Sequence, residues 1–123
     1  MPVRMPTVSP SAGRRLEELI PRAENVATKR LFGQPAAFVN GNLFAGAFGE
    51  KLFVRLSEPD AVDALRRPGF LPFEPMPGRP MRGYAVLPPS VLRRTVQARG
   101  WVTKAWKYVS TLPPKSARRS ASR

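Results

Sequence analysis

The stretch "FVNGNLFAGAFGEKLFVRL", residues 38–56, carries the clearest local structure signals in the chain. At its joint "VNGN", Asn40 and Gly41 both tolerate the positive φ angles of a type I′ turn, whose twist matches that of the strands it connects. A looser tight turn is expected around Gly49 and Glu50. The stretch therefore predicts antiparallel strands that are joined by short turns.

The strands on either side of these turns differ in regularity. Upstream, "TKRLFGQPAAFV" at residues 28–39 is predicted as one strand, in which Gly33 and Pro35 mark a bulge or an edge position. Downstream, Leu52, Val54 and Leu56 alternate with Lys51, Phe53 and Arg55. This alternation predicts that one sheet face is buried and that the other is only partly covered. On that second face, an exposed Phe53 beside Arg55 would be a site for stacking on nucleic-acid bases.

A helix with complete end signals follows in "SEPDAVDALRRPG", residues 57–69. Ser57 is the expected N-cap, and a proline in the first turn and a glycine beyond the last are typical of helix boundaries. Ala61, Val62 and Leu65 are the expected apolar contacts. This pattern predicts a helix that covers the sheet.

A second hairpin is expected from "FLPFE" and "MRGYAVL", which flank the proline-rich loop "PFEPMPGRPM" at residues 72–81. The prolines restrict the backbone of the loop, and they favour a braced turn over a ligand-binding loop or a polyproline docking motif.

Three further helices complete the predicted order. A short amphipathic helix is expected from residue 11 or 12 to Pro21, another at residues 90–99, and a last one at residues 101–112, with Gly100 as the interruption between the last two. In the last helix the aromatic residues fall in the apolar stripe. The order α-β-β-β-α-β-β-α-α predicts a two-layer α+β fold, in which helices pack on an antiparallel sheet of about five strands.

The chain length fits one domain, which we expect at residues 12–112. Residues 1–11 are expected to form a flexible lead, and residues 113–123 a disordered basic tail. There is no run of 18 apolar residues and no apolar signal segment, so we expect a cytoplasmic protein that does not enter a membrane.

The composition excludes several kinds of chemistry. The chain contains no cysteine and no histidine, which removes disulfides, thiolate or imidazole zinc sites and the Ser-His-Asp triad. The spacing of Gly33, Gly46 and Gly49 matches neither the dinucleotide pattern nor the phosphate-binding loop. We expect no catalytic residues, no cofactor and no metal, and an enzyme that uses carboxylates brought together by folding stays as the weakest alternative.

The net charge of +13 is unevenly distributed. Residues 1–74 hold ten Lys/Arg against eight Asp/Glu, whereas residues 75–123 hold eleven Lys/Arg and no acid. Such a field favours polyanions, and nucleic acid is therefore a possible partner. The alternative interpretation is a solvated basic surface that binds no nucleic acid. The candidate polyanion-binding residues are Arg79, Arg82, Arg93, Arg94, Arg99, Lys104, Lys107, Lys115, Arg118 and Arg119.

Three segments together resemble the N-terminal domain of the TfoX/Sxy family: "KRLFG" at 29–33, the opening stretch at 38–56, and "PFEPMPGRPMRGYAVLP" at 72–88. The resemblance implies a compact α+β domain of the secretion-chaperone-like type. Full-length members are regulators of competence genes, thought to act alongside a cyclic-AMP-responsive activator, and they carry a second helical domain that we do not expect here.

From this resemblance we expect a non-enzymatic, bacterial regulatory module, monomeric or homodimeric, that binds a protein partner and that takes part in transcriptional regulation. The alternative is direct binding of DNA or RNA through the basic C-terminal half and tail.

Overall fold

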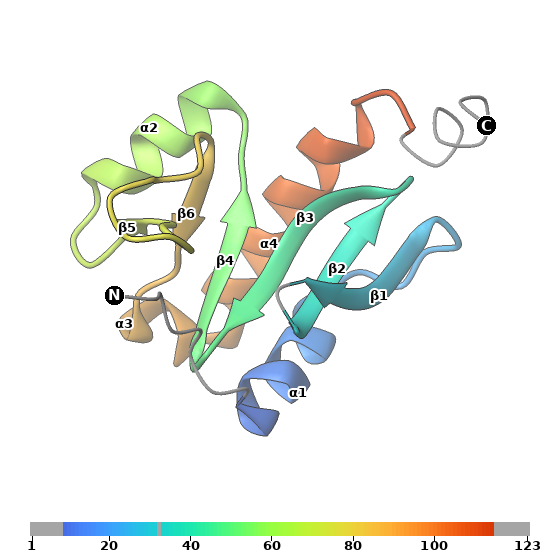
Figure 1. Ribbon diagram of the computed structural model, residues 1–123, viewed down its shortest axis with the longest axis horizontal. Helices are drawn as coiled ribbons and strands as arrows, with labels where there is room; N and C mark the ends of the chain where they lie inside the picture. Colours follow the sequence, from blue (N-terminus) through green and yellow to red (C-terminus); the bar gives the residue numbers. More distant parts are fainter. Residues whose placement is uncertain (1–8, 32, 115–123) are drawn as a thin grey trace.

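The computed structural model describes residues 9–31 and 33–114, and it has an antiparallel sheet with helices on one face (Figure 1). The strand order is β1-β2-β3-β4-β6-β5. The strands are β1 (Val26–Leu31), β2 (Gln34–Val39), β3 (Asn42–Phe48), β4 (Lys51–Arg55), β5 (Leu71–Pro72) and β6 (Tyr84–Val86). The helices are α1 (Pro10–Leu19), α2 (Glu58–Arg66), α3 (Pro89–Leu92) and α4 (Thr95–Ser110). The α+β class, the antiparallel sheet and the general order of the elements are confirmed.

The turns of the opening stretch form as the sequence predicts. Asn40 has φ 53° and Gly41 has φ 82°, and Val39 pairs with Asn42 across the turn. Gly49, also at positive φ, closes the connection from β3 to β4. The three strands β2, β3 and β4 consequently lie side by side and antiparallel.

The prediction of one strand over residues 28–39 is wrong. Gly33 has φ 76°, and it closes a hairpin in which Leu31 pairs with Gln34. The glycine therefore reverses the chain, whereas a bulge or an edge position was expected within one strand. The sheet has six strands for this reason, one more than expected.

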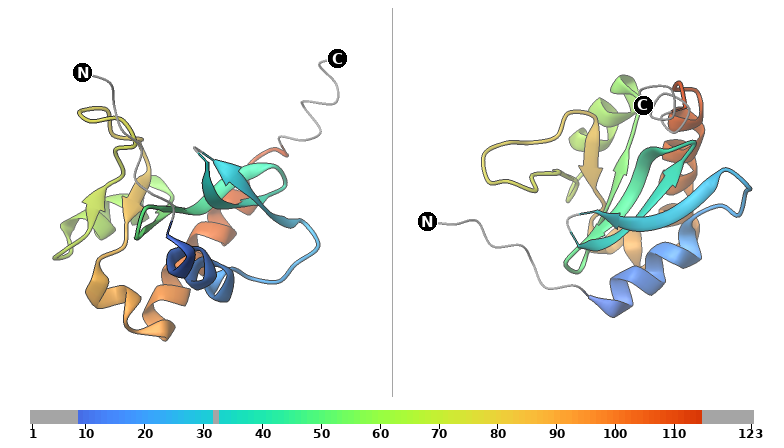
Figure 2. Two further views of the ribbon diagram at one scale, coloured as in Figure 1. Left: turned by 60° about the horizontal axis from the view of Figure 1, so that its bottom comes forward. Right: turned by 45° about the vertical axis from the view of Figure 1, so that its right-hand side comes forward.

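The alternation along β4 divides the apolar residues between the two sheet faces. Leu52 and Val54 point into the main core, which receives residues from all four helices. Phe53, between them, points to the opposite face and packs with Phe73, Tyr84 and Val86. The helix layer thus covers one face, and the second hairpin covers part of the other (Figure 2).

The helix α2 begins as predicted but faces the core differently. The Ser57 hydroxyl accepts a hydrogen bond from the Asp60 amide, which confirms the N-cap. The buried residues are Ala61 and Ala64, whereas Val62 and Leu65 are 46% and 40% exposed. The expectation that Val62 and Leu65 are core contacts is therefore wrong.

The predicted interruption at Gly100 is also wrong, because α4 runs through it without a break. The chain bends earlier, at Arg94, whose φ of −111° and ψ of 101° are extended. The predicted faces of the last helix are correct: Trp101, Val102 and Val109 are buried, and lysines lie on the opposite side.

The predicted lead falls mostly on residues 1–8 and the predicted tail mostly on residues 115–123, which lie outside the described part of the chain. Within the described part, no helix has both the length and the apolar content needed to cross a bilayer.

Candidate functional site

A row of paired residues crosses the sheet on the face opposite the helices. Ala36 pairs with Gly46, Gly46 with Phe53, Phe53 with Val86, and Val86 with Leu71. The residues of the row have small side chains at the β2–β3 end and large side chains at the β6–β5 end. The ring of Phe53 lies over Gly46, since a Cβ atom there would be 2.5 Å from the Phe53 Cζ atom.

The ring of Phe53 is itself covered. Phe73 stacks on it, with ring centroids 4.0 Å apart and 11° between the ring planes, and Phe53 is only 2% exposed. The hypothesis that Phe53 is an exposed stacking site for bases is therefore wrong. The reason is that the second hairpin folds back over this end of the sheet.

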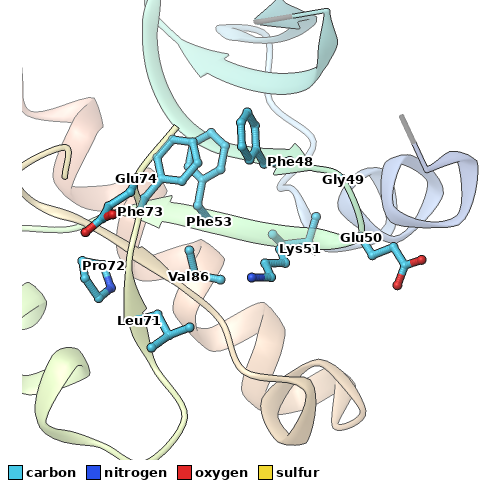
Figure 3. Close-up of a pocket in the computed structure, with 11 residues that line it drawn as sticks. Phe48, Gly49, Glu50, Lys51, Phe53, Leu71, Pro72, Phe73, Glu74 and Val86 are labelled. Carbon is cyan, nitrogen blue, oxygen red and sulfur yellow. The ribbon is translucent and has the colours of Figure 1, made fainter. Parts of the chain in front are cut away.

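A groove of about 660 Å³ remains beside this aromatic pair (Figure 3). We call it the hairpin groove, and its apolar lining residues are Phe48, Leu52, Phe53, Leu71, Pro72, Phe73 and Val86. Lys51 also lines it. Glu50 and Glu74 lie at opposite ends of the groove (Figure 3), so they do not form the carboxylate pair that acid/base catalysis requires.

A second groove, of about 710 Å³, lies between α2 and the end of the second hairpin. We call it the arginine groove, and its lining includes Arg55, Val62, Leu65, Met81, Arg82 and Tyr84. The guanidinium carbon of Arg55 is 5.8 Å from the centre of the Tyr84 ring. Burial raises the pKa of Tyr84 above its ordinary value, and nearby Arg55 opposes this effect. Tyr84 therefore stays neutral, and the groove is cationic at physiological pH.

The loop between the two hairpin strands is braced by hydrogen bonds. The Met81 amide donates to the Phe73 carbonyl at 2.8 Å, and the Arg79 amide donates to the Met76 carbonyl at 2.9 Å. At the tip, the Glu74 carboxylate accepts from the Gly78 amide at 3.2 Å. These contacts give the loop a fixed path between the two grooves.

The candidate polyanion-binding residues fall into two groups. Arg79 and Arg82 lie on the second hairpin, whereas Arg99, Lys104 and Lys107 lie on α4, on the other side of the sheet (Figure 2). Arg93 and Arg94 are exposed in the turn between α3 and α4. Lys115, Arg118 and Arg119 lie outside the described residues. The structure therefore does not gather the described candidates into one patch.

The α4 group lines a shallow groove of about 430 Å³, which we call the α4 basic face. Its lining is Val96, Arg99, Gly100, Thr103, Lys104 and Lys107, without an acidic residue. Across the described residues, no group of three or more Asp or Glu side chains is placed to hold a metal ion.

The arginine groove is not predictable from the sequence. The helical spacing of Val62 and Leu65 predicts core positions, and Arg55 stands out only as a neighbour of Phe53. The pattern of α2 alone gives no signal for their exposure, because Val62 and Leu65 lie at the same helical spacing as core residues.

Comparison with known proteins agrees with this architecture. Residues 18–109, which include all six strands, match the family model of the TfoX N-terminal domain. No curated protein and no solved structure matches the chain. The family match covers most of the chain and includes the residues that line both the hairpin groove and the arginine groove. The chain therefore belongs to the TfoX N-terminal domain family.

Proposed function

We propose that this domain is a non-enzymatic regulatory module that binds a protein partner through its second hairpin. The partner is a component of the transcription machinery, in keeping with the resemblance to competence regulators. The binding surface comprises the hairpin groove and the arginine groove, which adjoin because Pro72 lines both.

The observation that carries this proposal is the position of the exposed apolar side chains. Among the described residues, the large exposed hydrophobic side chains are Val62, Leu65, Leu71, Met76 and Val96. The first four lie on α2, β5 or the hairpin loop, and only Val96 lies on α4. Exposed apolar side chains that gather around grooves mark interaction sites, whereas isolated ones are ordinary.

The charge of the surface indicates the chemistry of the partner. Arg55 and Arg82 line the arginine groove, and Glu58 is the one acid among its lining residues. Arg79 adds a cation on the loop. A partner segment with aliphatic or aromatic side chains for the grooves and carboxylates for the arginines would complement this surface, because arginine binds carboxylates in a bidentate manner.

Site-specific photo-crosslinking in cells tests the proposal. A photo-crosslinking phenylalanine analogue at Leu65 should yield an adduct with one defined protein, and the same analogue at the exposed Val96 should not. The adduct should be lost in the Arg55→Glu/Arg82→Glu variant and kept in an Arg22→Glu/Lys29→Glu control, which has the same net charge.

An adduct from Leu65 that persists in the Arg55→Glu/Arg82→Glu variant would contradict the proposal that the partner binds these arginines through carboxylates. The absence of any adduct, or equal adducts from Leu65 and Val96, would contradict the interaction surface itself.

A further inference from the structure

We propose that the α4 basic face binds the phosphate backbone of a nucleic-acid duplex without reading its sequence. This inference is independent of the protein-binding proposal above, because the α4 basic face shares no lining residue with the hairpin groove or the arginine groove. It rests on the arrangement of the cations, on the small residues between them and on the positions of the aromatic rings.

The cations of the α4 basic face are spaced along one side of a regular helix. Arg99 and Lys107 are eight residues apart on α4, which separates them by roughly 12 Å along the helix axis. The major groove of B-DNA is about 12 Å wide. Cations with this separation can approach phosphates on both sides of the groove, with Lys104 between them.

Small residues let a sugar-phosphate strand approach the helix closely. Gly100 and Thr103 lie between the cations in the lining of this face. A Cβ atom at Gly100 would have no neighbour within 4 Å, so the space above it is open. Exposed Arg93 and Arg94 extend the positive charge beyond the start of α4.

The acids that flank α4 leave the cations available. The Lys104 ammonium is 3.9 Å from the Asp60 carboxylate, and both side chains are substantially exposed. Such a pair contributes about 1 kcal/mol or less. Arg99 donates one hydrogen bond to the Glu18 carbonyl at 3.1 Å, which positions the guanidinium and leaves its other donors free to bind phosphate. The Glu18 carboxylate is itself paired with Arg15.

The aromatic residues of α4 favour a duplex over a single strand. Single-strand binding surfaces use exposed rings on which bases stack. Trp101 is buried and has the Arg67 guanidinium carbon 5.3 Å from its ring centre, while Trp106 and Tyr108 pack against the main core. The α4 basic face therefore offers cations without a stacking platform, and such contacts position a duplex without specifying its sequence.

Fluorescence anisotropy with labelled 20-bp DNA and RNA duplexes, measured between 50 and 200 mM salt, tests the inference. The test variant is Arg99→Gln/Lys104→Gln/Lys107→Gln. The matched control is Arg22→Gln/Lys29→Gln/Arg30→Gln, which has the same net charge and alters exposed cations away from α4. Wild type should bind with a steep salt dependence. The test variant should lower the magnitude of the log–log slope by roughly 2 to 3, because each lost phosphate contact contributes about 0.9.

The control variant should keep most of the affinity and slope. Absence of binding by wild type at 50 mM salt would overturn the inference, and so would an equal loss in the control and test variants, because binding would then follow net charge alone. Tighter binding of a single strand of the same length would contradict the proposal that the ligand is a duplex. Equal binding of a poly-glutamate peptide through the same residues would instead indicate an acidic protein. A preference between the DNA and RNA duplexes would identify which of the two supplies the phosphates.

Discussion

At the scale of single residues, two glycines with different surroundings should respond in opposite ways to alanine. At Gly46 the new Cβ atom would meet the Phe53 ring at 2.5 Å, and that ring is held in a stack with Phe73. We expect Gly46→Ala to destabilise the fold by about 1–3 kcal/mol through overpacking. At Gly100, inside α4, the added methyl group meets nothing, and the gain in helix propensity should stabilise the fold by up to about 1 kcal/mol.

Thermal or urea unfolding of the two variants beside wild type measures these effects. A change of 1 kcal/mol corresponds to a shift in Tm of roughly 4–8 °C for a domain of this size. A stabilised Gly46→Ala variant would show that the Phe53–Phe73 stack is not fixed. A destabilised Gly100→Ala variant would show that α4 does not continue through residue 100.

The same residues illustrate which local features the sequence can predict. The turn at Asn40 and Gly41 was predictable, because positive φ angles are a property of the residues themselves. The role of Gly46 was not predictable, because its small size makes room for the Phe53 ring. That role depends on the register of β3 and β4, which brings Phe53 opposite it.

At the scale of elements, a buried side chain connects the β1–β2 hairpin with the β3–β4 turn. The Gln34 side chain at the start of β2 is 1% exposed and accepts a hydrogen bond from the Gly49 amide, at 3.1 Å, in the β3–β4 turn. Gln34→Leu keeps a side chain of similar length at this site but leaves the buried Gly49 amide without that acceptor. We expect a loss of about 1–3 kcal/mol in the free energy of unfolding, and faster hydrogen exchange at the Gly49 amide.

Asn42→Ala serves as the comparison, because the Asn42 side chain donates to the Pro113 carbonyl in a surface hydrogen bond of 2.9 Å. An exposed contact of this kind should change stability by no more than about 0.5 kcal/mol. Equal effects of the two substitutions, or unchanged exchange at Gly49, would show that Gln34 does not fix the turn.

Element boundaries were predictable where the signals are local. The start of α2 follows from Ser57, and the hairpin at "VNGN" follows from its turn residues. The hairpin at Gly33 was missed, because a glycine followed by a nearby proline suits a bulge as well as a turn. The orientation of α2 was not predictable, because it depends on how the helix packs on the rest of the fold. In the structure Ala61 and Ala64 face the core, and Val62 and Leu65 lie at the surface.

At the scale of the whole molecule, the cations of residues 75–123, a region without acids, are distributed over both sides of the sheet. Composition predicts its charge but not its placement, because residues close in sequence move apart when the sheet inserts between them. Arg82 comes to line the arginine groove, and Arg99 comes to lie on α4. The two groups of cations have different neighbours. Apolar side chains surround the arginines of the hairpin, whereas the small residues Gly100 and Thr103 lie between the cations of the α4 basic face.

This separation predicts that the two proposed binding activities are independent. Arg55→Glu/Arg82→Glu should abolish the crosslink from Leu65 while duplex affinity stays close to that of wild type, and Arg99→Gln/Lys104→Gln/Lys107→Gln should do the reverse. Because the arginine groove and the α4 basic face share no lining residue, the combined variant should lose as much duplex binding free energy as the α4 variant alone, to within about 0.5 kcal/mol. The measurement is crosslinking from Leu65 with and without saturating duplex, together with anisotropy of all three variants. Crosslinking that falls as duplex is added would show that partner and duplex compete for one surface, and the separation of the cations by the sheet would then have no functional meaning.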